Sequence, residues 1–256
     1  MDYHEDRIEL GDDMLGRLFG DLNKALSTPF LDSKRDFAAA EVWTRSGLSL
    51  QERWLITLTC VAEAANAAEN DKYVLGALQS KALSLEEMRE FVLHFAVYCG
   101  WSKAEALDEA VTRAAGKLDL KEPARASRLS LEPAERQARG AACWVSVMTF
   151  PPPPPDVPYT SAGILNFVFG EMWDRPGLAR KARRFVTVAA VAVSDAHVPT
   201  LAHVYAALKS GDVTPAEMEE FILHYAVYAG WPKASDMMAC VRDVTKRIAE
   251  GRGLHD

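Results

Sequence analysis

Apolar side chains recur at intervals of three and four residues along most of the chain, the spacing that gives a helix one buried face. In residues 50–68 the apolar positions Leu55, Leu58 and Ala62 follow this spacing, and alanine, the strongest helix former, is abundant. No segment of useful length alternates apolar and polar residues as a half-buried strand does. The pattern therefore predicts an all-α protein with a helix over residues 50–68.

Capping residues mark the ends of several further helices. Ser84 and Thr214 each stand three residues before a glutamate, the spacing of a capping box at a helix N-terminus. The helices that they open are expected to end at Gly100 and Gly230, because glycine tolerates the left-handed backbone found at helix C-termini. One more helix is predicted after each glycine: residues 102–117 and residues 232–248.

One stretch of the chain occurs twice. Glu87–Ala104 and Glu217–Ala234 are identical at 13 of 18 positions, and each residue matches the one 130 positions further along. The same offset relates residues upstream of this block without a gap. We therefore expect a tandem duplication, with a first repeat at residues 1–125, a second at residues 161–256 and a connecting segment at residues 126–160.

The connecting segment has two parts with different expectations. Residues 134–140 are compatible with a helix and correspond to residues 6–20 of the first repeat. Pro151–Pro155 lack backbone donors and favour an extended polyproline II conformation, which predicts a stiff spacer. A ligand for a proline-recognition domain is the alternative.

Composition narrows the class of protein. Apolar residues make up 49% and charged residues 25% of the chain, as in ordinary globular proteins, and the net charge of −7 argues against a nucleic-acid partner. The polar, acidic N-terminus does not resemble a signal peptide, and no apolar run is long enough to span a membrane. The four cysteines are widely spaced and form no metal-binding pattern. We expect a cytoplasmic protein with no membrane partner, no metal and buried, reduced cysteines.

His203 is the first candidate for a catalytic residue. The first repeat has Tyr73 at the equivalent position, and both side chains combine an apolar body with a proton-donating tip. A histidine satisfied within the core is the alternative. His197 and Asp195 add polar groups on the same segment, where the first repeat has alanines.

Further candidates have ordinary structural alternatives. Glu171 is a possible acid or base beside the histidine, or a partner of Arg175 four residues on. His224 follows Glu220 by four residues, and His94 follows Glu90 in the same way, which favours an ion pair on one helix face over a metal site. Trp231, Trp101 and the nearby tyrosines Tyr98 and Tyr228 are packing residues or line a small-molecule pocket.

The motifs together resemble the carboxymuconolactone decarboxylase family. The resemblance rests on W-x-R-x-G-L, then H-x-x-x-A-L-x-x-G-x-T-x-x-E, then E-x-x-L-H-x-A-V-Y-A-G-W-P-x-A in the second repeat, beginning at Trp173, His203 and Glu220. The first repeat shows the same blocks, with Ser46, Tyr73, Lys81 and Ser102 in place of Pro176, His203, Gly211 and Pro232. The resemblance covers nearly the whole chain outside the spacer.

The resemblance implies an assembly and excludes one branch of the family. Its members are small helical proteins that form rings, typically hexamers, so a tandem chain is expected to be a homotrimer with pseudo-sixfold symmetry. The hydroperoxidase branch carries a CxxC pair before the histidine. Ala196 and Pro199 occupy those positions in the second repeat, as Asn66 and Glu69 do in the first, so no reactive thiolate is present there.

The decarboxylase branch implies a cofactor-free reaction on a small carboxylate or lactone substrate. By this resemblance His203 would be the acid or anion stabiliser, Glu171 would orient it or relay the proton, and Arg175 or Arg183 would hold the substrate carboxylate. Tyr73 would be a poor base at neutral pH, which favours one pocket per chain, centred on the second repeat; a composite pocket that uses both residues is the alternative. An isomerase, hydratase or cyclase on the same scaffold and a non-catalytic binding protein are further alternatives.

Overall fold

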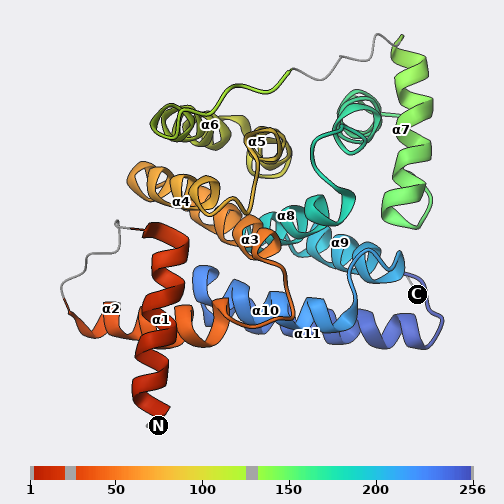
Figure 1. The fold of residues 1–256 in the computed structure, drawn as a ribbon. Helices are drawn as coiled ribbons and strands as arrows, with labels where there is room; N and C mark the ends of the chain where they lie inside the picture. The colour runs from red at the N-terminus through yellow and green to blue at the C-terminus, as the bar shows by residue number, and fades with distance from the viewer. Residues whose placement is uncertain (1–2, 21–26, 125–131, 255–256) are drawn as a thin grey trace.

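The computed structural model describes residues 3–20, 27–124 and 132–254, and within these ranges it contains helices and no strands (Figure 1). The all-α prediction is confirmed. The helices are, in chain order, α1 (Tyr3–Phe19), α2 (Pro29–Ser33), η2 (Lys34–Trp43), α3 (Leu50–Glu63), α4 (Ala67–Gln79), α5 (Leu85–Cys99), α6 (Trp101–Lys117), α7 (Pro133–Met148), η3 (Tyr159–Met172), α8 (Arg180–Val193), α9 (His197–Lys209), α10 (Pro215–Ala229) and α11 (Trp231–Ala249).

The predicted caps of α5 and α10 are confirmed. The Ser84 hydroxyl accepts a hydrogen bond from the backbone of Glu87, whose carboxylate accepts one in return from the Ser84 backbone. Thr214 opens α10 with the same reciprocal pair. Gly100 and Gly230 end these helices, each at a φ of 95°, a conformation that a residue with a Cβ adopts only with strain.

The prediction of one helix over residues 50–68 is wrong in its C-terminal part. α3 ends at Glu63, because Ala65 takes a φ of 56° and interrupts the helical backbone. Asn66 then opens α4, and its side chain accepts hydrogen bonds from the backbone of Ala68 and Glu69. Helical periodicity continues across this turn, so the asparagine cap was the available signal.

The two repeats exchange helices. α3 and α8 lie side by side in the middle of the molecule (Figure 1). α5 of the first repeat packs on α8 of the second, and α10 of the second packs on α3 of the first. The hydrophobic core around α3 to α6 accordingly includes Ala182 and Val186 of α8, and the core around α8 to α11 includes Ile56 and Cys60 of α3. Each core is therefore built from both repeats.

Each repeat also places a helix across a π-helix, η2 or η3, in which hydrogen bonds such as Trp173 N–H to the Val168 carbonyl span five residues. α7 packs on η3 as α1 packs on η2, which agrees with the expected correspondence of residues 134–140 with the start of the chain. The backbones approach closely at Gly140, where an added Cβ would lie 1.7 Å from the carbonyl oxygen of Leu165. The expected repeat boundary near residue 125 lies outside the described residues.

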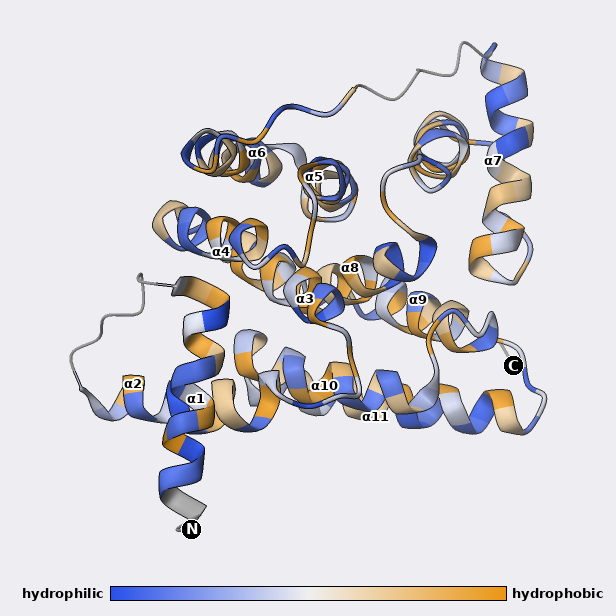
Figure 2. Cartoon of the chain, viewed as in Figure 1, coloured by the Kyte–Doolittle hydropathy of each residue, from blue (hydrophilic) through white to orange (hydrophobic). Residues whose placement is uncertain are grey.

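Hydropathy follows this arrangement. Figure 2 shows hydrophobic positions along the central helices α3 and α8, whereas α1 alternates hydrophilic and hydrophobic positions along its length. Among the described helices, none combines the length and the apolar character that crossing a membrane requires. Pro151–Pro155 form an irregular segment between α7 and η3.

Candidate functional site

The helix exchange brings a histidine of one repeat against an arginine and a threonine of the other. His224 on α10 lies 2.9 Å from Thr57 Oγ1 through its Nε2, and 3.2 Å from Arg53 Nη1 through its Nδ1. His94 on α5 makes the same contacts with Thr187 and Arg183, at 2.9 Å and 3.3 Å. These two sets define a first-repeat site, built on α3 and closed by α10, and a second-repeat site, built on α8 and closed by α5.

Both histidines are neutral. A guanidinium only donates hydrogen bonds, so the Nδ1 atom that faces it accepts and the proton resides on Nε2. Burial and the nearby arginine charge lower the pKa of His94 and His224 well below the usual value. Neither ring is exposed to solvent. They are fixed structural links between the repeats, and as neutral rings they do not act as acids at neutral pH.

The expected ion pairs within α5 and α10 are wrong. Glu90 binds Arg175, with Oε1 2.6 Å from Nη2, and also lies 3.3 Å from Nη2 of Arg183. Glu220 binds Arg45 and Arg53 in the same way. Arginines of the other repeat take the place of the expected histidine partners, because they bind each carboxylate with several charge-assisted hydrogen bonds.

A tyrosine one turn further along each exchanged helix meets a tryptophan of the other repeat. Trp43 Nε1 donates to the Tyr228 hydroxyl at 2.7 Å, and Trp173 Nε1 donates to the Tyr98 hydroxyl at 2.8 Å. Burial raises the pKa of both phenols. Both tyrosines therefore stay protonated at neutral pH and can act only as hydrogen-bonding groups.

His203 lies in the second-repeat site. Its ring centroid is 5.4 Å from that of Tyr98, and it stacks on Trp173 at 6.4 Å. The side chain is 8% exposed, and its Nδ1 atom has no hydrogen-bond partner among the described residues. Burial, together with the charge of Arg184, lowers the pKa of His203 to about 3. The ring is thus a neutral imidazole in aromatic surroundings.

Three other predicted site residues have ion-pair partners or positions that separate them from His203. Glu171 forms an ion pair with Arg136 at 2.5 Å. Arg175 is held by Glu90 from two sides and is therefore already paired. His197 is exposed and lies six residues before His203, on another face of α9.

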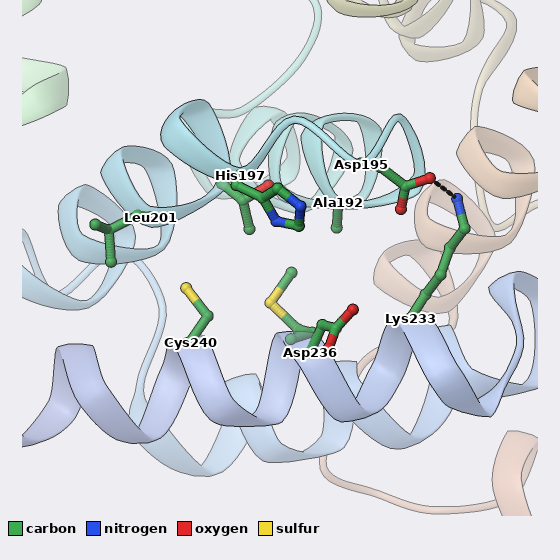
Figure 3. A pocket seen from close by; sticks show the side chains of 9 residues that line it. Ala192, Asp195, His197, Leu201, Lys233, Asp236 and Cys240 are labelled. Carbon is green, nitrogen blue, oxygen red and sulfur yellow. Dashed lines mark hydrogen bonds and ion pairs between the residues drawn. The ribbon is translucent and has the colours of Figure 1, made fainter.

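His197 belongs to a different pocket. Figure 3 shows its ring between α9 and α11, across from Cys240 and Asp236, while Lys233 binds Asp195 at 2.9 Å. This pocket is small, about 210 Å³. The expectation that His197 adds polarity beside His203 is therefore wrong, because a six-residue step on a helix turns the side chain well away.

A larger cavity of about 520 Å³ opens at the first-repeat site. Tyr73 stands in its wall, and Trp231 lines it from the start of α11, where its ring lies 6.2 Å from that of Phe37. Tyr228 faces Tyr73 edge-on at 6.0 Å. Trp231, like His224 beneath Tyr228, therefore lies with Tyr73 rather than with His203.

Lys34 brings positive charge into this cavity. Its Nζ donates to the Tyr73 hydroxyl at 3.3 Å and lies 5.5 Å above the ring of Phe19. Burial, reinforced by the neighbouring charge of Lys72, lowers the pKa of Lys34 to about 8. Sequence analysis did not identify Lys34, which lies on the π-helix η2, 39 residues from Tyr73.

The two repeats differ in the polarity of these positions. The first-repeat cavity is lined by Lys34, Asn66, Glu69 and Tyr73. Residues 130 positions further along are Ile164, Ala196, Pro199 and His203. At the three positions around Tyr73 the first repeat therefore has charged or hydrogen-bonding side chains, whereas the second repeat has apolar ones around His203. Within the described part of the chain, no three His, Cys, Asp or Glu side chains are placed to hold a metal ion.

The fold and the site define a class: an all-helical tandem protein whose two composite sites are each completed by a helix of the other repeat. The family model of the carboxymuconolactone decarboxylase family matches residues 29–122 and 158–243. The chain belongs to the carboxymuconolactone decarboxylase family, in a two-copy form.

Curated relatives share part of the chain. It is 37% identical over 85 residues to a 4-carboxymuconolactone decarboxylase of Acinetobacter baylyi, a match that covers 33% of this chain and 63% of the relative. It is 36% identical over 84 residues to a nitrosuccinic acid decarboxylase of Metarhizium robertsii, covering 32% and 58%. The matches thus span about three fifths of the length of each relative.

Proposed function

We propose that the protein is a decarboxylase-like lyase for small carboxylates, working by acid–base chemistry in the first-repeat cavity. The observation that carries the proposal is the pairing of Lys34 with the Tyr73 hydroxyl at 3.3 Å in the wall of a cavity of about 520 Å³. The two relatives named as decarboxylases support the reaction class. This choice of cavity differs from the sequence-based prediction of a pocket centred on His203.

The chemistry follows from the groups present. Loss of CO₂ leaves an electron pair on carbon, which a neighbouring electron-withdrawing group must accept as negative charge on oxygen. A lysine ammonium and a neutral phenol that converge on one point stabilise such an oxyanion, the more so in a water-poor cavity. Lys34, with a pKa of about 8, is also suited to protonate the carbanionic carbon near neutral pH.

The second-repeat site has a supporting place in this proposal. His203 is neutral and surrounded by aromatic rings, and Arg175 and Arg183 are occupied by Glu90. We propose that this site acts as scaffold, or binds a substrate without turning it over. The predicted catalytic roles of His203 and Glu171 stay predictions that the following experiment tests.

The test measures CO₂ release and loss of ultraviolet absorbance with 4-carboxymuconolactone and with 2-nitrosuccinate. Lys34→Met and Tyr73→Phe should each lower turnover by about 10²-fold or more, the usual cost of losing one oxyanion donor. His203→Gln, the matched variant of the second repeat, should retain turnover. Loss of turnover in His203→Gln alone would move the reaction to the second-repeat site. Conversion of a probe without CO₂ release by wild-type protein would indicate an isomerase, hydratase or cyclase instead.

We further propose that three copies of the chain form a ring. An apolar groove of about 720 Å³ runs between α10 and α11, and its counterpart of about 420 Å³ runs between α5 and α6. Two acids and one base, Glu105, Asp108 and Arg89, line the α5–α6 groove, whereas two bases and one acid, Arg242, Lys246 and Glu219, line the α10–α11 groove. The opposite charges suit head-to-tail contacts between unlike grooves, which close into a ring.

The exposed tryptophans in the two grooves supply the test of assembly. Trp101 is 62% exposed and Trp231 is 58% exposed, and burying such rings commonly dominates an interface. Light scattering on wild-type protein should give the mass of a trimer, and Trp101→Asp should give a monomer. A monomeric wild-type protein would overturn the ring.

A further inference from the structure

We propose that Lys34 is a nucleophile that forms an imine with its substrate, which makes β-oxo acids the substrate class of the first-repeat cavity. The inference rests on the proposed function only in assigning a carboxylate substrate to this cavity. The geometry points to covalent chemistry because Lys34, which lines the cavity, shares two aromatic rings with a second lysine, Lys72, and one of these rings, Tyr73, also lines the cavity.

The crowding is seen in the distances to two rings. Lys34 Nζ lies 5.5 Å from the ring centroid of Phe19 and 5.6 Å from that of Tyr73. Lys72 Nζ lies 5.2 Å and 5.9 Å from the same two centroids. Two ammonium groups over the same rings repel each other, and at Lys34 this repulsion adds to the effect of burial in favouring the free amine.

The surroundings of Lys34 differ from those of a lysine held in ion pairs. Lys181 bridges Glu52 at 3.1 Å and Glu217 at 2.5 Å, which holds its proton firmly. Among the residues that the structure describes, Lys34 makes no ion pair, and its hydrogen-bond partner is a phenol. Its pKa of about 8 leaves a usable fraction of free amine near neutral pH.

The reaction balances with groups already at the cavity. The free amine of Lys34 adds to the ketone carbon of a β-oxo acid, and uptake of one proton from solvent or a cavity acid with loss of one water molecule gives a protonated imine. The bond between the α-carbon and the carboxylate then breaks, CO₂ leaves, and its electron pair forms an enamine with the iminium as acceptor. A proton from solvent or from a cavity acid returns to the α-carbon, and water hydrolyses the imine to release the ketone and the lysine.

Neighbouring residues fit parts of this sequence. Lys72, whose Nζ lies 5.9 Å from the Tyr73 ring centroid, can attract the substrate carboxylate. The Tyr73 hydroxyl, at 3.3 Å from Nζ, can donate to the departing oxygen. Glu69 lines the same cavity and can carry protons to and from the carbinolamine. The second repeat has Ile164 in place of the lysine and cannot form an imine there.

The experiment traps the imine with sodium borohydride in the presence of acetoacetate, followed by intact mass measurement and peptide mapping. A reduced adduct formed before CO₂ loss adds about 86 Da, and one formed after CO₂ loss, or from acetone, adds about 42 Da. We expect stoichiometric labelling confined to Lys34. A mass increase of only about 86 Da, without CO₂ release, would support the imine and contradict the proposed lyase function.

Three variants make the result specific. Lys34→Arg keeps the charge but should reduce the labelling at least 10-fold. Lys181→Met, which removes a second partly buried lysine, should be labelled as wild-type protein is. Lys72→Met should shift the trapping to higher pH, because removing its charge favours the protonated form of Lys34. Circular dichroism confirms that each variant is folded.

Two results would overturn the inference. Labelling that persists in Lys34→Arg would show modification of other lysines. Absence of label at Lys34 in folded wild-type protein would exclude the imine, and CO₂ release from 4-carboxymuconolactone or 2-nitrosuccinate in the same preparation would show that the lyase proposal survives without it.

Discussion

The three buried histidines make the stability of the fold dependent on pH in a calculable way. His94 and His224 are fully buried and His203 is 8% exposed, and all three have a pKa below the usual value of about 6.5. The folded protein therefore binds fewer protons at these rings than the unfolded chain does once the pH falls below about 6.5. Stability must rise with pH in this window and fall on acidification.

The magnitude follows from the protons taken up by the unfolded chain. Between about pH 7.5 and pH 5.5 each such histidine lowers the unfolding free energy by about 1.4 kcal/mol, so the three lower it by about 4 kcal/mol together. This is a large share of the roughly 5–15 kcal/mol by which domains are stable. Glu217 and Glu220, whose pKa is lowered by lysine or arginine partners, lose their contribution only below about pH 4.5 and do not overlap with this window.

Urea unfolding at several pH values and one protein concentration is the assay. Replacing one buried ring, as in His94→Gln, should reduce the pH slope of the unfolding free energy by about a third, whatever it does to stability itself. His197→Gln, which alters an exposed histidine, should leave the slope unchanged. A wild-type free energy that is flat between pH 7.5 and 5.5, or an unchanged slope in His94→Gln, would refute the assignment of neutral, buried rings.

Three further predictions use other parts of the molecule. Glu90→Gln should cost about 3 kcal/mol in urea unfolding, because it leaves Arg183, 1% exposed, without its carboxylate; a loss below 1 kcal/mol would contradict the buried pair. Gly140→Ala should lower the unfolding free energy by about 3 kcal/mol, since its Cβ would lie 1.7 Å from a carbonyl oxygen. The control Gly163→Ala, with open space at its Cβ, should be neutral or slightly stabilising when both variants are compared with wild type by thermal melts. Binding of glutarate, a dicarboxylate without a ketone, should weaken up to 10-fold per pH unit above about pH 8 by calorimetry as Lys34 loses its proton; an affinity that is flat to pH 9.5 would exclude Lys34 as the anion site.

Local and repeated features of the fold were predictable from the sequence. The glutamates after Ser84 and Thr214 identify the capping boxes because such caps need only neighbouring residues. The offset of 130 positions identifies the duplication, and the motifs identify the family. The break at Ala65 was missed because helical periodicity continues through the turn and only Asn66 marks it.

Which residues make up the two sites could not be predicted from residue spacing in the sequence. His224 and His203 belong to the same repeat, but helix exchange places His224 against Thr57, 167 residues away in the chain. Lys34 and Tyr73 are similarly brought together by tertiary packing, and the sequence holds no periodic signal for their contact. Ion pairing followed the same principle: Glu90 was expected to bind on its own helix, whereas the other repeat supplies arginines with better geometry.

The exchange of α5 and α10 has a consequence for how the chain is made. The partner of His94 lies 93 residues further along and the partner of His224 lies 167 residues back. At about 5–20 residues per second of synthesis, α5 waits about 5–20 s on the ribosome before α8 exists to receive it. The first repeat therefore emerges as an unfinished half with an apolar helix face uncovered, and its site closes only when nearly the whole chain has been translated. Fusing the two copies ensures that the missing half is always the next segment out of the ribosome.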